Sequence, residues 1–108
     1  MKRAYITLAA TLFSLPALAF DPSMQMTGAA FSDACTRANE SWISFCNGYA
    51  QAAIDGIREG DGICIPRGTT RTDIVTITEK VITASSKLQA MNAHDAVRLV
   101  IRHAYPCS

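Results

Sequence analysis

The side chains that could perform acid–base chemistry are few and lie apart in the sequence. His94 and Asp95 could form an acid–base pair, but adjacent helical residues point about 100° apart and seldom meet. Asp55 follows Gln51 by one helical turn, and a lone carboxylate there is expected to be solvated or hydrogen-bonded locally. His103 suits the negative end of a predicted helix. An enzyme would need His94, Asp95 and Asp55 to converge, and we predict no catalytic site.

The sequence also lacks the usual motifs for cofactors and metals. It contains no nucleophile elbow, phosphate-binding loop, HExxH motif or dinucleotide fingerprint, so we predict no cofactor. Its four cysteines are separated by ten, seventeen and forty-two intervening residues. Structural zinc sites usually pair ligands two to four residues apart, so we predict no zinc site. These cysteines are Cys35, Cys46, Cys64 and Cys107.

The first nineteen residues have the pattern of an export signal. Lys2 and Arg3 precede an apolar run over residues 4–15, and residues 17–19 read Ala-Leu-Ala, the small-x-small pattern that a signal peptidase cuts. The apolar run is shorter than the roughly 20 residues that cross a bilayer. Phe20 follows the predicted cut where a lipoprotein would need cysteine. We therefore predict a signal peptide at 1–19 and one domain at 20–108, free in the periplasm or secreted and without membrane insertion.

Charge and length limit the partners that the chain can have. The chain has 108 residues, 49% of them hydrophobic, with ten Lys and Arg against nine Asp and Glu. Without Lys2 and Arg3, eight basic residues remain against nine acidic ones, a formal charge of −1. A nucleic-acid-binding protein would show a basic stripe that neutralises phosphates, and we expect no nucleic-acid partner.

In an oxidising compartment, four cysteines in a short chain indicate two disulfides. Three pairings are possible, and helix geometry favours Cys35–Cys46 with Cys64–Cys107. An antiparallel helix hairpin that turns at residues 38–41 places the first two cysteines at similar height. The other two lie in proline-containing irregular segments that can adapt to the separation a disulfide requires. Such cross-links matter because a small domain buries a limited share of its surface.

Apolar residues at three- and four-residue steps predict four helices, and so an all-α domain. The first spans residues 25–37. The second follows Ser41 as its N-cap and stops at Gly60-Asp61-Gly62. The third begins with a capping box between Thr70 and Asp73; its β-branched content allows a strand, but the spacing favours a helix. The fourth runs from an Asn92 cap to Pro106, and residues 85–93 are expected to form a loop with one helical turn.

Two segments could present a binding surface. Arg67 and Arg71 lie in a glycine-containing loop beside a cysteine, and a loop with a fixed base often carries a binding element. Trp42 and Tyr49 could be interface anchors, but their helical spacing favours the core. We therefore assign partner binding to the 58–72 loop and the 85–94 segment. The candidate contact residues are Arg58, Arg67, Arg71, Leu88, Met91 and His94.

The order and spacing of these features resemble the Rap/Tai family of type VI secretion immunity proteins over residues 27–107. The residues that carry the resemblance are Cys46-x-Gly48-Tyr49, Asp55, Cys64-Ile65-Pro66-x-Gly68-Thr69 and Ala104-Tyr105-Pro106-Cys107. The resemblance implies a small periplasmic helical protein, usually dimeric, that occludes the substrate groove of a peptidoglycan amidase toxin. By position it assigns structural roles to the four cysteines and to Gly48, Tyr49, Asp55, Pro66 and Pro106.

Two other functions are compatible with the same sequence. The first is a periplasmic stress chaperone, or an orphan binding protein of the same fold. An acid-switched chaperone needs many groups that titrate together, and nine acids with two histidines are unremarkable. The second is an enzyme, for which no constellation of catalytic residues is present. A non-enzymatic immunity protein is therefore the favoured interpretation.

Overall fold

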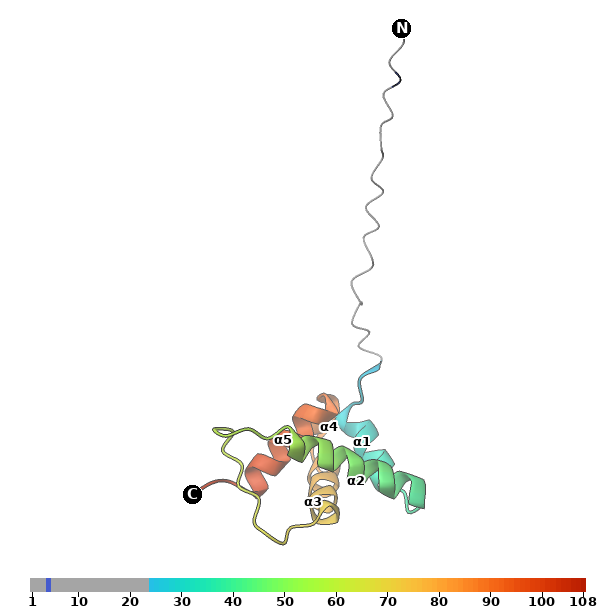
Figure 1. Ribbon diagram of the computed structural model, residues 1–108. Coiled ribbons are helices and arrows are strands. Elements are labelled where there is room, and N and C mark those ends of the chain that lie inside the picture. Colours follow the sequence, from blue (N-terminus) through green and yellow to red (C-terminus); the bar gives the residue numbers. More distant parts are fainter. Residues whose placement is uncertain (1–3, 5–23) are drawn as a thin grey trace.

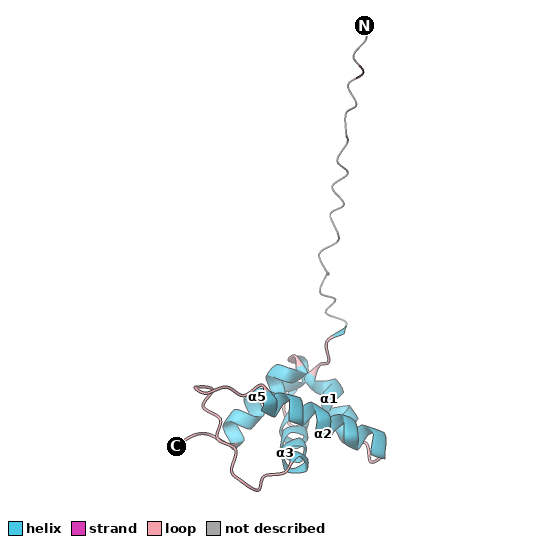
Figure 2. Ribbon diagram, in the orientation of Figure 1, coloured by secondary structure: helices cyan, strands magenta, loops and turns pink. Residues whose placement is uncertain are grey.

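The computed structural model describes Ala4 and residues 24–108, which form an all-α domain (Figures 1 and 2). The predicted fold class is confirmed. Apart from Ala4, the predicted signal peptide lies outside the described residues. Five helices occur in the described part, and none of them is long and apolar enough to cross a membrane. In chain order they are α1 (Gly28–Cys35), α2 (Glu40–Asp55), α3 (Arg71–Thr83), α4 (Ser86–Ala90) and α5 (Ala93–Ala104).

Each helix begins at a residue whose side chain accepts a backbone amide of the first turn. The predicted capping box is present in α3, where Thr70 Oγ1 accepts the Asp73 amide at 3.0 Å and Asp73 Oδ2 accepts the Thr70 amide at 2.9 Å. Asn92 caps α5 as predicted. The short helix α4 is the single helical turn that the sequence indicated in residues 85–93. The other caps are Thr27, Asn39 and Ser85.

The bounds of α2 differ from the prediction at both ends. Asn39, not Ser41, is the N-cap, because Asn39 Oδ1 accepts the Trp42 amide at 3.0 Å. The helix ends at Asp55, five residues before the predicted glycine stop. Beyond it the chain turns, and the Arg58 amide donates to Asp61 Oδ2 at 2.8 Å, a bond that continued helix would not allow. The first helix is also shorter than predicted, since it spans Gly28–Cys35 within 25–37.

The core lies where α5 packs against α1, α2 and α3. Five residues of α5 are buried, whereas Ala104, the last residue of the helix, is exposed. The two buried polar side chains are paired: the Thr78 hydroxyl donates to the Ile74 carbonyl, and Ser32 bonds to Thr83. The largest fully buried side chains are Phe31, Ile74, Ile82, Ile101, Val97, Thr78 and Cys46.

A close backbone contact fixes the start of α1 against the segment before α5. A Cβ on Gly28 would lie 2.1 Å from the Leu88 carbonyl oxygen, so only glycine fits there. The Gly28 amide donates to the Met91 carbonyl at 2.8 Å, and the Ala93 amide donates to the Met26 carbonyl at 2.8 Å. The predicted 85–94 segment is therefore held by backbone hydrogen bonds as well as by packing.

The two disulfides lie in different surroundings. Cys35–Cys46 joins α1 to α2 with a Cα–Cα distance of 5.8 Å, and Cys46 is buried. Cys64–Cys107 joins the segment after α2 to the C-terminus with a Cα–Cα distance of 4.9 Å, and both of its residues are exposed. One bond thus lies inside the helical body, and the other closes an irregular segment on its surface.

Candidate partner-binding site

The segment between α2 and α3, residues 56–70 and here termed the connector, is the largest irregular element in the described chain (Figure 1). Its centre is fixed to the C-terminus by the Cys64–Cys107 disulfide. The Cys64 amide donates to the Tyr105 carbonyl at 2.8 Å, and the Cys107 amide donates to the Gly62 carbonyl at 3.2 Å. Pro106 pairs with Ile63 in an isolated bridge. The connector therefore has a covalently and hydrogen-bonded base.

Its first half is fixed to α5 through Arg98. Arg98 Nη2 contacts Asp61 Oδ2 at 2.9 Å, and Arg98 Nη1 donates to the Gly56 carbonyl at 3.3 Å. The backbone hydrogen bond from Arg58, followed by the bond from Arg98, lowers the pKa of Asp61 below its usual range. About a quarter of each side chain in the Arg98–Asp61 pair is exposed, so the solvent screens this pair only in part.

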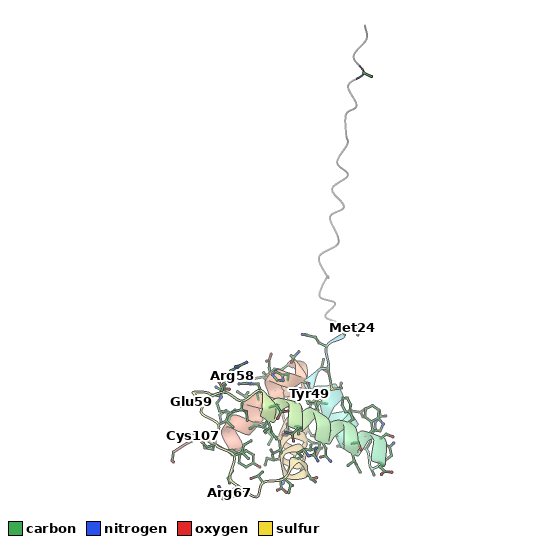
Figure 3. The ribbon with its side chains drawn as sticks, viewed as in Figure 1. Met24, Tyr49, Arg58, Glu59, Arg67 and Cys107 are labelled. Atoms are coloured by element: carbon green, nitrogen blue, oxygen red, sulfur yellow. A yellow bond between two sulfur atoms is a disulfide. The ribbon has the colours of Figure 1, made fainter. Side chains whose placement is uncertain are left out.

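Beyond this base the connector projects two bends into solvent. Figure 3 labels Arg58 and Glu59 at one bend and Arg67 at the other, with Cys107 between them. All three side chains at the bends are exposed. At the second bend the Thr69 amide donates to the Pro66 carbonyl at 3.2 Å, and Gly68 has φ +95°, a value that favours glycine. The arrangement can offer charged side chains on a short, closed turn.

The second predicted contact segment, residues 85–94, leads into the start of α5. Its predicted contact residue Leu88 is only 8% exposed and packs in the core. Met91 is half-buried, and His94 is exposed on the first turn of α5. The connector instead contacts Arg98, at the middle of α5, and Tyr105, which follows the last residue of that helix. The two predicted segments thus flank one helix of about 18 Å and do not form one continuous loop surface.

The groups considered for acid–base chemistry do not assemble in the described chain. Asp55 Oδ1 accepts a hydrogen bond from Gln51 Nε2 at 2.8 Å, the local pairing expected of a lone carboxylate. Within residues 24–108, neither His94 nor His103 forms an ion pair with a carboxylate. The same residues contain no cluster of three side chains that could hold a metal ion.

An apolar groove of about 270 Å³ opens between α3, α4 and α5, which sequence reasoning missed. Val81 is 38% exposed because it lies at the edge of this groove. The sequence signal for this groove was the apolar stripe of α3, which is wider than the surface that the neighbouring helices cover. Its lining residues are Ile77, Val81, Leu88, Leu99, Val100, His103 and Ala104.

The outer side of α2 carries a second partly exposed apolar surface. Trp42 and Phe45 pack edge to face with ring centroids 5.7 Å apart, and Phe45 lies 6.1 Å from Tyr49. The Arg37 guanidinium lies 4.8 Å above the Trp42 ring. Phe45 is 39% exposed. Burial, and then the nearby charge of Asp95, raise the pKa of Tyr49 above its usual value.

A family model described as Rap1a immunity proteins matches residues 27–107. The chain belongs to the Rap1a immunity protein family. The matched range begins at Thr27, the N-cap of α1, and ends at Cys107, so it includes all five helices and both disulfides. No curated protein and no solved structure matches the chain significantly.

The residues that carried the family resemblance have distinct places in this Rap1a family member. Gly48 lies exposed at the middle of α2, and Tyr49 packs against Phe31 with ring centroids 5.2 Å apart. Asp55 ends α2. The carbonyl of Pro66 accepts the turn hydrogen bond at the second bend of the connector. Of the predicted contact residues, Arg58, Arg67, Arg71 and His94 are exposed.

Proposed function

We propose that this protein is a periplasmic immunity protein that binds a peptidoglycan-amidase toxin of a type VI secretion system and inhibits it by steric occlusion. Membership of the Rap1a immunity protein family carries this proposal. The cross-linked helical body supports it, because a rigid surface loses little conformational entropy on binding. The proposed mechanism uses no catalytic group and no cofactor of this chain.

The connector is the element that we assign to the toxin. Its base is held by a disulfide and by Arg98, whereas Arg67 stands exposed on a turn closed at Thr69 and Gly68. A short projecting turn on a fixed base fits into a concave substrate groove without reorganising. Arg71, the exposed first residue of α3, extends the contact. A stable complex of this kind buries about 1,600 Å² in total.

The compartment and the oligomeric state complete the proposal. The Cys64–Cys107 disulfide is exposed, and exposed disulfides persist in oxidising compartments such as the periplasm. The export pattern of residues 1–19 supports the same location. The family resemblance also supports a homodimer, whose surface is considered below.

Inhibition of cell-wall digestion tests the function directly. Purified peptidoglycan sacculi are incubated with a type VI secretion amidase from the same organism, and the release of peptide stems is measured while this protein is added. We expect release to stop near one protein chain per toxin, as for a tight stoichiometric inhibitor. Persistence of digestion at tenfold excess against every amidase of that system would contradict the proposal.

A matched pair of charge variants tests the assignment of the connector. Arg67→Glu reverses a charge at the exposed turn, and Thr76→Glu adds a negative charge to an exposed position of α3. We expect the first variant to raise the concentration needed for half inhibition by about tenfold or more, equivalent to about 1.4 kcal/mol of binding free energy. The second should inhibit as the wild type does. Equal inhibition by all three proteins would remove the connector from the interface.

A further inference from the structure

Gly28 and Gly48 both lie on helices, but contacts within the chain explain only one of them. Gly28 is explained within the chain, because a Cβ there would clash with the Leu88 carbonyl. Gly48 lies at the middle of α2, where a Cβ would meet no atom within 4 Å. Glycine weakens a helix interior relative to alanine. Nothing within the described chain therefore requires glycine at position 48, whereas a second helix packed closely against α2 would.

The surface around Gly48 has the composition of a protein interface. Between Glu40 and Asp55 the helix carries no charged residue, although much of it faces solvent. The centres of interfaces are depleted of charge, and their strongest contacts come from Trp, Tyr and Arg. Trp42, Tyr49 and Arg37 lie along one flank of α2, linked through Phe45. Ala52 continues the exposed side beyond Gly48.

We propose that the outer side of α2 is the contact between two copies of this chain, which pack α2 against α2 in antiparallel orientation about a two-fold axis near Gly48. This inference rests on the homodimer of the proposed function and assigns its surface. A two-fold contact must be self-complementary, so that residue i meets j and j meets i. With the axis near Gly48, Phe45 of each copy lies over Ala52 of the other, a large side chain against a small one. Gly48 then allows the two helix backbones to approach.

The charges at the ends of α2 fit the antiparallel orientation. Glu40 begins the helix, and Arg58 follows its end by three residues; both are exposed. Antiparallel packing brings Glu40 of one copy near Arg58 of the other, and the symmetry makes this pair twice. It also brings Arg37 towards Asp55, at a helix end whose last turn holds no basic residue of its own. Parallel packing would place like charges together at both ends.

A bulky variant at Gly48 tests the close approach. Gly48→Arg should keep the wild-type helical content by circular dichroism, because position 48 is open. In sedimentation equilibrium we expect it to weaken the dimer by at least about tenfold. Thr76→Arg, the same addition at an exposed position of α3, should dimerise as the wild type does. A monomeric wild type at the highest concentration, or a Gly48→Arg variant with unchanged dimerisation, would overturn the proposal.

Exchange of the end charges tests the orientation. Glu40→Arg and Arg58→Glu should each weaken the dimer several-fold, and the double variant should restore it, because each pair is then re-formed with reversed charges. A double variant whose dimer is as weak as the two single variants combined would rule out antiparallel packing.

Sacculus digestion is measured on the same proteins. If Gly48→Arg stays dimeric but no longer inhibits the amidase, α2 contacts the toxin and the dimer surface is wrong; if wild type inhibits as a monomer, only the proposed function survives.

Discussion

The helical body and the connector are stabilised by different means. In the body, the Cys35–Cys46 bond joins two helices that already pack around Phe31, and Cys46 is itself buried. The connector has no helix, and both cysteines of its Cys64–Cys107 bond are exposed. Its other contacts are the hydrogen bonds of Arg98 and of the backbone, together with Ile57, Ile63 and Ile65, which are partly buried against the core. Full burial of apolar side chains therefore stabilises the body, whereas the connector combines partial apolar burial with a cross-link and a few hydrogen bonds.

The difference shows how a small domain can present a stiff recognition loop. A chain of this size cannot surround a protruding segment with apolar neighbours, because its buried surface is limited. A disulfide stabilises such a segment instead, because it restricts the unfolded chain. In the loop-closure model, the bond that closes 43 residues raises the free energy of unfolding by about 4 kcal/mol. The bond that closes 11 residues raises it by about 2.8 kcal/mol. Because the connector bond is exposed, it is also the one that reductants reach first.

The largest expected effect comes from emptying the core of the body. Phe31 is 1% exposed and packs against Tyr49, so Phe31→Ala should lower the free energy of unfolding by about 3–5 kcal/mol. Thermal unfolding followed by circular dichroism measures the change. Val81→Ala is the control, since its side chain is partly exposed and should cost less than about 1 kcal/mol. Similar losses from both variants would contradict the assignment of stability to burial.

Removal of the connector disulfide should separate the two regions most clearly. In the double variant Cys64→Ala, Cys107→Ala we expect faster amide exchange in residues 56–70 and at the C-terminus, with little change in α1 and α2. The free energy of unfolding should fall by at most about 4 kcal/mol. Hydrogen exchange with mass spectrometry provides the regional readout. Equal acceleration throughout α1, α2 and α5 would show that the connector and the body unfold as one unit.

The body was also the more predictable region. Apolar steps of three and four residues located the helices, and local hydrogen-bonding chemistry predicted the capping box at Thr70 and the cap at Asn92. The end of α2 was mispredicted because Ile57 keeps the apolar period beyond Asp55. A contact from a distant helix, Arg98 with Asp61 and Gly56, favours the turn instead. Sequence periodicity contains no information on that partner.

The candidate surfaces were predicted less well for a related reason. An apolar stripe shows which side of a helix turns inward, but not how far the neighbours cover it. Phe45 and Val81 stand at the edges of such stripes, and both are more than a third exposed. Leu88 shows the opposite case, since it lies in a segment that reads as a loop yet belongs to the core. The exposed arginines of the connector were easier to predict, because charge keeps them in solvent.

The smallest expected effect concerns the polar contact that joins the two regions. The pKa of Asp61 is lowered in the folded protein, mainly by the Arg58 amide and then by Arg98. The folded state therefore binds a proton less readily than the unfolded state, and the ionised carboxylate stabilises the fold above the usual Asp value of 3.8. This contribution fades as the pH falls below that value towards the lowered pKa.

Asp61→Asn should accordingly melt below the wild type at pH 6, and the two melting temperatures should converge towards pH 3. Glu59→Gln, which removes a neighbouring exposed charge, should show no such pH-dependent gap. A gap that persists at pH 3 would mean that Asp61 acts through its shape, and that the connector is joined to α5 without help from its charge.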